Sequence, residues 1–299
     1  MSASRKRISI VVSLLVLTAM ILSACQQATA DDLLGQIKTR GTIRISTDPN
    51  YAPQSSLVAA GQRAANTKCA ADQLTAGQLE GFDIDTAVEV AKRLGVEACF
   101  VTPTWDTITA GSWGGQWDIS VGSMTITKPR QQVVFFSPGY YFTPAQFAVA
   151  KDSGINTLAD LNGKPVCVGS STTYEDYLNG KLGIPDSDIK APAPTGVQVV
   201  SLETDAECAQ AIQSGRKEFA AFLTSATVVD QSISKGIPVV KLGPPVFIEN
   251  LAVAIDKKAS KDTKSLLDAI SNAITAMHTD GSLKTSSVKW FGADLTTLP

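Results

Sequence analysis

The fold assignment of this chain rests on the segment Trp117-Asp-Ile-Ser-Val-Gly-Ser-Met-Thr-Ile-Thr-Lys-Pro-Arg130. Its first half is apolar enough for a short buried strand, and Gly122 permits the tight backbone path with which we expect the strand to break into a loop. The hydroxyl donors in this loop are Ser123, Thr125 and Thr127. Arg130 ends it with a planar guanidinium that can hold a carboxylate through two parallel hydrogen bonds. The segment therefore predicts a small anion-binding site.

The end of this loop has the residues of a helix start. Thr127 can serve as the N-cap and Pro129 suits the first turn, which would put Arg130 at the positive end of a helix dipole. An ordinary strand-to-helix connection with a solvated arginine would have the same residues. Spacing alone does not separate the two interpretations.

Strands and helices alternate on both sides of this segment. We expect strands over 42–46, 96–104, 164–168 and 219–224, and helices over 83–94, from the Thr204-x-x-Glu207 capping box to Gly215, and from Leu266 to Met277. The alternation indicates a parallel, doubly wound α/β sheet. Extended segments over 142–149 and 237–247 would carry the chain to a second lobe and back. The pattern therefore predicts a two-lobed clamshell with a two-stranded hinge.

Several segments occur in the order typical of one protein family. They are Gly41–Pro53, Gly81–Asp85, Ala91–Gly95, Gly122–Arg130, Phe136–Pro138, Tyr140–Tyr141 and Lys289–Gly292. Together they resemble the polar amino-acid family of extracytoplasmic solute-binding proteins, family 3, which feed ABC importers. The resemblance implies a type II periplasmic-binding-protein fold. Residues 39–140 and 246–299 would form lobe 1, and residues 141–245 would form lobe 2.

Residues 1–24 have the features of a secretory signal peptide. The basic start Arg5-Lys-Arg7 precedes an apolar run that is too short for a permanent membrane span. Leu22-Ser-Ala-Cys25 resembles a lipoprotein processing box, in which Cys25 becomes the lipidated first residue. A plain signal peptide with an incidental cysteine is the alternative. We expect residues 25–38 to form a lipidated tether that anchors an extracytoplasmic protein to the outer face of the cell membrane or in the periplasm.

The composition of the 299 residues is that of a globular protein, with 44% hydrophobic and 18% charged residues. The signal peptide carries three basic and no acidic residues, so its removal takes the net charge from −2 to −5. No basic stripe for nucleic acid remains. We expect a monomer without a cofactor, whose partners are a small solute and the subunits of an ABC permease.

Four cysteines remain after Cys25, and an even number in an exported chain indicates disulfides. Three pairings of these four residues are possible. The lobe assignment puts Cys69 with Cys99 and Cys167 with Cys208. Zinc ligation is the alternative use, but the sequence has no CxxC motif and only one histidine, His278.

The resemblance also implies roles for single residues in a ligand site. Arg130 would bind the ligand carboxylate, aided by Ser123 and Thr125 from lobe 1 and by Thr172 and Thr173 from lobe 2. For these two threonines, simple N-capping of the following helix is the alternative. The matching positions for the ligand side chain are Asp48, Tyr51 and Trp105. Without the resemblance, the aromatic residues would read as core and Asp48 as a turn residue that binds its own backbone.

The sequence departs from the family at Thr224. Many relatives have an aspartate there that pairs with the ligand ammonium, and a hydroxyl cannot supply that charge. We still expect an α-amino acid with a polar or basic side chain, and keep a carboxylate without the amine as the alternative.

Binding rather than catalysis is the expected activity. A Ser/His/Asp set is not indicated with a single histidine, and no thiol stays free once two disulfides form. The enzymatic alternative is a periplasmic dehydratase of the cyclohexadienyl type, which has the same fold and needs a carboxylic acid in the cleft.

Overall fold

The computed structural model describes residues 31–297. Its helices are α2 (Leu33–Arg40), α3 (Phe82–Leu94), α4 (Trp105–Thr109), α5 (Arg130–Val133), α6 (Thr173–Leu178), α7 (Asp205–Gln213), α8 (Ala226–Ser234), α9 (Lys264–Thr279) and α10 (Ser282–Phe291), with short 3-10 helices η1 (Ala76–Gln78), η2 (Leu158–Leu161) and η3 (Asp186–Asp188). Its strands are β1 (Thr42–Ser46), β2 (Asn50–Tyr51), β3 (Ser55–Leu57), β4 (Leu74–Thr75), β5 (Leu79–Glu80), β6 (Glu97–Val101), β7 (Ile119–Thr125), β8 (Val134–Ala150), β9 (Pro165–Gly169), β10 (Gln198–Leu202), β11 (Ala221–Ser225) and β12 (Val239–Asp256). The predicted signal peptide and Cys25 lie outside the described residues.

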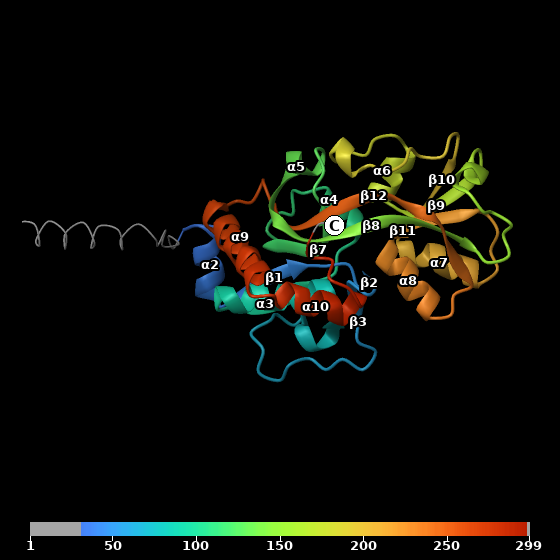
Figure 1. The fold of residues 1–299 in the computed structure, drawn as a ribbon. Coiled ribbons are helices and arrows are strands. Elements are labelled where there is room, and N and C mark those ends of the chain that lie inside the picture. The colour runs from blue at the N-terminus through green and yellow to red at the C-terminus, as the bar shows by residue number, and fades with distance from the viewer. Residues whose placement is uncertain (1–30, 298–299) are drawn as a thin grey trace, which may run out of the picture.

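One nine-stranded sheet runs through both lobes in the order β10-β9-β11-β8-β12-β7-β1-β6-β4. Its two central strands, β8 and β12, are antiparallel and pair from Val134↔Asp256 to Ala150↔Val239. They cross from one lobe to the other (Figure 1). Parallel pairs flank them, β1 with β6 and β7 in lobe 1, and β9 with β10 and β11 in lobe 2. The two-lobed α/β fold with a two-stranded hinge is therefore confirmed.

Strand β7 differs from the prediction that it breaks at Gly122. It continues to Thr125, and Ser123 within it has a φ of 55°, in the left-handed region. The register of β7 against β12 shifts in the same part, between Ala252 and Ala254. An irregularity of this kind redirects side chains without ending the strand. The hydroxyl-bearing residues therefore lie on an irregular strand rather than in a loop.

Helix α3 shows how the local sequence determines an element. Its buried face repeats at helical spacing through Ile84, Ala87, Ala91 and Leu94, and Gly95 ends the helix with a φ of 70°. Acidic residues lie in its first turn and basic residues in its last, as the helix dipole favours. The helix covers the lobe 1 part of the sheet and positions Asp83 behind β7.

Each lobe has its own apolar core, and the hinge strands divide between them. Tyr141 packs in the lobe 1 core, whereas Val246 and Phe247 pack in the lobe 2 core. The lobe boundaries predicted from the sequence place Tyr141 in lobe 2 and Val246 and Phe247 in lobe 1, so the structure corrects both boundaries. A strand that crosses between lobes carries no sequence signal for its crossing point, because both cores select the same apolar residues.

Helix α2 corrects the predicted tether of residues 25–38. Asp32 caps its first turn by accepting a hydrogen bond from Gly35 N at 2.7 Å, and Leu33, Leu34 and Ile37 are buried in the lobe 1 core. A segment with a cap and an apolar face folds onto the lobe rather than extending as a linker. Lobe 1 therefore begins before residue 39, with α2.

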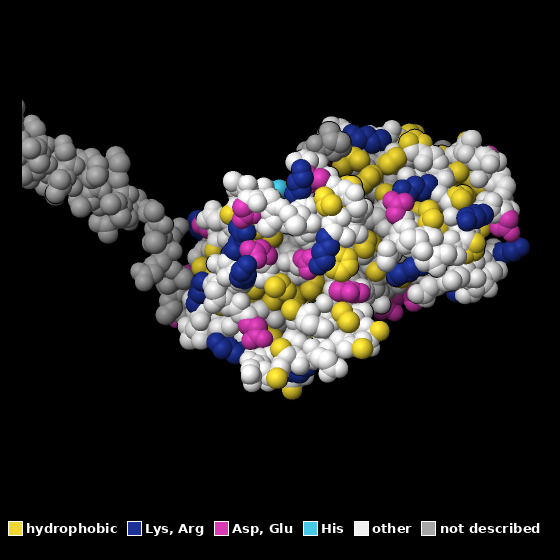
Figure 2. All heavy atoms as spheres, turned by 60° about the horizontal axis from the view of Figure 1, so that its bottom comes forward, with side chains coloured by type: hydrophobic (Ala, Val, Ile, Leu, Met, Phe, Trp, Pro, Cys, Tyr) yellow, Lys and Arg dark blue, Asp and Glu magenta, His cyan; other side chains and the backbone are white. Residues whose placement is uncertain are grey.

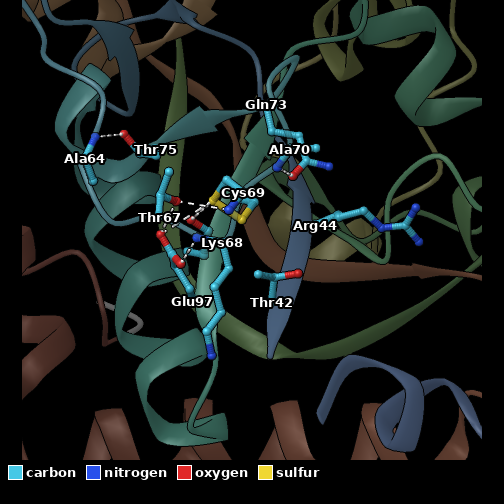
Figure 3. The surroundings of a disulfide bond; sticks show 12 residues. Thr42, Arg44, Ala64, Thr67, Lys68, Cys69, Ala70, Gln73, Thr75 and Glu97 are labelled. Carbon is cyan, nitrogen blue, oxygen red and sulfur yellow. Dashed lines mark hydrogen bonds between the residues drawn. A yellow bond between two sulfur atoms is a disulfide. The ribbon is translucent and has the colours of Figure 1, made fainter. Parts of the chain in front are cut away.

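Both predicted disulfide pairings are found in the structure. Cys69 is bonded to Cys99, and Cys167 to Cys208. The first bond joins the polar segment between β3 and β4 to β6 (Figure 3), where Glu97 also accepts a hydrogen bond from Lys68 N at 2.8 Å. Each bond lies within one lobe, so neither restrains the hinge.

The surface carries both signs of charge. On the face shown in Figure 2, basic and acidic side chains are interspersed over both lobes. Within residues 31–297, no helix combines the length and apolarity needed to span a membrane.

Candidate ligand-binding site

A cavity lies between the two lobes, beside the hinge strands. It holds about 470 Å³ of space not filled by protein atoms, counting the part open to solvent. Its lining is Asp48, Tyr51, Trp105, Gly122, Ser123, Thr125, Arg130, Gly169, Thr172, Thr173, Tyr174, Glu203, Thr204, Asp205 and Glu249. Eight of the nine residues expected to bind ligand are in this lining, and Thr224 is not. The narrow space suits a small molecule enclosed on most sides.

Contacts across the cavity hold the lobes together. The Tyr51 hydroxyl lies 2.9 Å from that of Tyr174, and Trp105 Nε1 donates to Ser171 O at 3.2 Å. Beside the cavity, Gln54 Nε2 donates to Thr227 Oγ1 at 2.6 Å. The structure is therefore a closed form of the clamshell.

Arg130 is the one cation in the cavity lining. Its side chain is buried, with Nη1 donating to Thr125 O at 3.3 Å and Nη2 to Ser171 O at 3.0 Å, and its guanidinium lies 5.4 Å from the centre of the Trp105 ring. Burial lowers the pKa of Arg130, and the charge of Glu249 opposes that shift. Among the described residues Arg130 forms no ion pair. Its acceptors are neutral carbonyls, so its charge is available to a ligand anion.

Glu249 is a site residue that the sequence analysis missed. It lies on β12 and is 2% exposed. Its Oε1 accepts hydrogen bonds from Thr125 at 2.7 Å and from Thr173, and its Oε2 accepts one from Tyr174 at 2.7 Å. Burial raises the pKa of Glu249, although these hydrogen bonds favour the ionised form. The hydroxyls of Thr125 and Thr173, expected to bind the ligand carboxylate, therefore bind an internal carboxyl group in this form.

Asp205 is the second missed residue, and it changes the interpretation of Thr224. It begins α7, where its Oδ1 accepts from Gly169 N at 2.8 Å and its Oδ2 accepts from Thr224 Oγ1 at 2.9 Å. The Thr224 side chain is fully buried and lies outside the cavity lining, so Asp205 rather than Thr224 lines the cavity at this place. Gly169 is needed here, since a Cβ would lie 2.7 Å from Asp205 Oδ1. Asp205 thus supplies a carboxylate in lobe 2, although position 224 lacks one.

The hydroxyl of Ser123 has two partners within lobe 1. It donates to Asp83 Oδ2 at 2.7 Å and lies 2.6 Å from the Tyr141 hydroxyl, both within lobe 1. Ser123 is part of the cavity lining as well. Its contact with the ligand carboxylate stays a prediction.

Thr172 and Asp48 line the cavity while making local contacts. Thr172 caps α6, accepting from Glu175 N at 3.2 Å and donating to Gly169 O at 2.7 Å. Asp48 accepts from Asn50 N at 2.9 Å, as a turn aspartate does. Thr172 therefore caps a helix and Asp48 binds its own turn, as the alternatives from the sequence stated, and both residues also line the cavity.

Two signals in the sequence could have revealed the missed acids. A capping box beginning at Thr204 places the next residue, Asp205, at the start of a helix that faces the other anion-binding loops. Glu249 interrupts the apolar run from Val246 to Ile255, and a charged residue inside such a strand indicates a buried functional group. Neither signal predicts which groups the carboxyl groups of Asp205 and Glu249 contact.

The cavity lining contains more acidic than basic residues. Four acids line it, Asp48, Glu203, Asp205 and Glu249, against one base, Arg130. Burial raises the pKa of Asp205 to about 7 and also raises that of Asp48. Over residues 31–297, no cluster of three or more His, Cys, Asp and Glu side chains has the arrangement needed to hold a metal ion. The site therefore combines one fixed cation with several carboxyl groups.

Comparison with known proteins gives the same assignment as the sequence motifs. Residues 70–293 match the family described as bacterial extracellular solute-binding proteins, family 3. The L-cystine-binding protein TcyJ of Escherichia coli is 29% identical over 281 residues, which cover 93% of each chain. The histidine-binding periplasmic protein of Salmonella typhimurium is 30% identical over 259 residues, covering 85% of this chain and 88% of the relative.

A solved structure extends the comparison. The ancestral amino acid-binding protein AncCDT-1, described as a precursor of cyclohexadienyl dehydratase, superposes with a TM-score of 0.67 at 32% identity. The match covers 86% of this chain and 99% of that one. These similarities concern almost the whole described chain, including both lobes and the hinge.

Proposed function

Because the chain belongs to the bacterial extracellular solute-binding proteins of family 3, we propose that it captures an α-amino acid with a polar or basic side chain and delivers it to an ABC importer. The two lobes close over the amino acid outside the cytoplasm. The matched relatives bind cystine and histidine by name, so an amino acid is the substrate class of this family branch. Which amino-acid side chain binds depends on the residues that line this cavity.

One observation carries the proposal: a cation without an ion pair and a buried carboxyl group face one cavity from different lobes. Arg130 of lobe 1 suits the ligand carboxylate, and Asp205 of lobe 2 suits the ligand ammonium. An amino acid that binds both groups links the lobes, which favours the closed form. Asp205 therefore takes the role that the family assigns to the position of Thr224.

The remaining acids favour a basic or polar side chain. Asp48 and Glu203 line the cavity, and the Trp105 ring lies at its edge beside Arg130. Carboxylates bind an ammonium or guanidinium through charge-assisted hydrogen bonds. An acidic side chain would add repulsion to a cavity that already holds four acids.

A ligand-stabilisation screen tests the proposal. Each standard L-amino acid and L-cystine is compared with its deaminated analogue by thermal unfolding. At a hundred times the dissociation constant, binding adds about 2.7 kcal/mol of stability, which raises the melting temperature of a chain this size by roughly 5–10 °C. Stabilisation by a plain carboxylate, with none by any amino acid, would refute the assignment of Asp205.

The membrane anchor is part of the same proposal. Cys25, outside the described residues, would be lipidated and would hold the monomeric protein at the membrane surface near its permease. The Cys25→Ala variant should remain unprocessed or leave the membrane fraction. Recovery of cleaved, mature variant in that fraction would argue against the lipid anchor.

Glu249 favours a second candidate function, dehydration of a cyclohexadienyl substrate. Such an enzyme needs a carboxylic acid in the cleft, and Glu249 is a buried carboxyl in the cavity lining whose pKa is raised by burial. Assays with prephenate and arogenate separate the functions. Turnover that disappears in Glu249→Gln would establish the enzyme, whereas binding of amino acids without turnover supports the transport protein.

A further inference from the structure

We propose that Glu249 makes ligand capture proton-coupled, because it shares its hydroxyl donors with the ligand carboxylate and takes up a proton when that carboxylate binds. The inference rests on the proposed function, since it requires a ligand that carries a carboxylate. It gives Glu249 a role in ligand binding that is argued from its contacts in this structure and not from the matched proteins.

The sharing follows from where the donors lie. Thr125 belongs to β7 in lobe 1 and Thr173 to α6 in lobe 2, and both donate to Oε1 of Glu249 on the crossing strand β12. A hydroxyl has one proton to donate, so it serves one carboxylate at a time. Arg130, beside them, is where the ligand carboxylate must lie for its charge to be matched. A bound carboxylate therefore competes with Glu249 for the same two hydroxyls.

Among the residues that the structure describes, Arg130 is the cation that acts on Glu249, and no second one does. The charged and titratable groups that act on it are Arg130 of α5, Tyr174 of α6, Tyr51 of β2 and Asp205 of α7. From β7 the contact is the uncharged Thr125. One guanidinium cannot compensate two carboxylates where both it and Glu249 are buried. Like charges so close together share a proton instead of both ionising.

Protonation resolves the competition. A neutral Glu249 no longer repels the ligand carboxylate, and its own O–H can donate to an adjacent oxygen. Burial already raises the pKa of Glu249, which favours uptake of a proton from solvent when the ligand carboxylate binds. The ligand and the proton thus bind together, and affinity should rise as the pH falls.

Isothermal titration in buffers of different ionisation enthalpy measures the protons taken up. The titrants are the amino acid that stabilises most in the thermal screen and its decarboxylated amine, for example L-arginine and agmatine. Between pH 6 and 9, wild type should take up at least about half a proton more than Glu249→Gln at some pH. Asp205, whose pKa is about 7, also releases protons, and the charge of Glu249 contributes to that raised pKa. The same comparison is therefore repeated in the Asp205→Asn background, where the difference isolates Glu249.

The affinity should follow the same pattern. In the pH range where Glu249 is ionised only before binding, wild-type affinity should fall up to tenfold per pH unit relative to that of Glu249→Gln. The variant, which resembles a protonated glutamate, should bind more tightly than wild type at high pH. Equal proton counts and parallel pH profiles in the two proteins would overturn the inference.

Two controls test whether the proton uptake depends on the shared hydroxyls and on the ligand carboxylate. Asp176→Asn removes a half-buried acid whose charge acts on Arg130 but which receives no hydroxyl from Thr125 or Thr173. It should keep the proton uptake of wild type, and loss of that uptake would contradict the sharing of donors. The decarboxylated amine needs no variant and should bind wild type without uptake at Glu249. Uptake equal to that seen with the amino acid would overturn the inference.

Failure of the proposed function gives a different result. No binding of any amino acid to wild type or variant at any pH refutes amino-acid capture and the inference with it. Tight binding in both proteins with identical proton counts leaves the proposed function in place and refutes only the role of Glu249.

Discussion

Asp83 in lobe 1 and Asp205 in lobe 2 are alike in position and differ in use. Each lies in the first turn of a helix, α3 or α7, is buried, and has a pKa raised by burial to about 7. Asp83 accepts from the Ser123 and Tyr140 hydroxyls, each at 2.7 Å, and is absent from the cavity lining. Asp205 accepts from Gly169 N and Thr224 and lines the cavity.

The difference lies in what each carboxyl group supports. The Ser123 N–H donates to the Tyr140 hydroxyl at 2.9 Å, so Asp83 and Tyr140 together hold Ser123 in its left-handed conformation. A non-glycine residue in that conformation costs energy that its surroundings must offset. In lobe 2, glycine at position 169 leaves room for Asp205 instead. An aspartate in the first turn of a helix therefore supports the site in lobe 1 and lines the cavity in lobe 2.

Removing the cation that lines the cavity with Asp205 should weaken binding most. Arg130→Ala should lower amino-acid affinity more than a hundredfold, because loss of a buried charged partner costs about 3–5 kcal/mol. Titration calorimetry measures the loss, and circular dichroism checks the fold. Arg93→Ala, in partly exposed ion pairs with Glu89 and Asp280, is the matched control and should bind like wild type. Unchanged affinity in Arg130→Ala would place the pocket elsewhere.

The paired variants Asp205→Asn and Asp83→Asn test the contrast between the two acids directly. Asp205→Asn should weaken binding of an amino acid roughly ten- to hundredfold, since a hydrogen bond to a charged group contributes about 1.5–3 kcal/mol. Asp83→Asn should change affinity only a few fold and act mainly on stability. Equal losses of affinity in the two variants would remove the distinction between a ligand group and a supporting group.

The pH dependence of stability should reveal both acids in the unliganded protein. Their folded pKa of about 7 lies above the ordinary value of 3.8, so the folded state holds protons that the unfolded chain releases. This contribution is fully present below about pH 4 and is lost as the pH rises through 7. The melting temperature should therefore fall by several degrees between pH 5 and 8.

Each aspartate should account for part of that fall. Asp83→Asn and Asp205→Asn should each flatten the profile, because an amide does not titrate. Scanning calorimetry over the pH range, without ligand, measures this. A profile that keeps its slope in both variants would contradict the raised pKa of these groups.

Weaker effects are expected from the hydroxyls that serve the two acids. Thr224→Val removes a donor from Asp205 and should weaken amino-acid binding by about 1 kcal/mol, near fivefold. Ser123→Ala removes a donor from Asp83 and should lower the melting temperature while changing affinity less. Calorimetry of the two variants side by side measures both quantities, and the reverse order of effects would exchange the assigned roles.

The framework of this protein could be predicted from local sequence. Such patterns predicted α3, the capped start of α7 and the strands β1, β6, β9 and β11, because apolar spacing and capping act over a few residues. The motifs also located Arg130, and the lobe assignment led to both disulfide pairs. Each of these predictions needs only residues that are close in sequence, or residues that belong to the same lobe.

Which polar groups meet in the cavity depends instead on how the chain folds in three dimensions. Glu249 faces Thr125, 124 residues away, and Thr173, 76 residues away. Thr224 donates a hydrogen bond to Asp205, and the Ser123 hydroxyl donates one to Asp83. A carboxyl or hydroxyl has no pattern that names its partner, because hydrogen bonds are short-ranged and the fold alone brings distant segments within their reach.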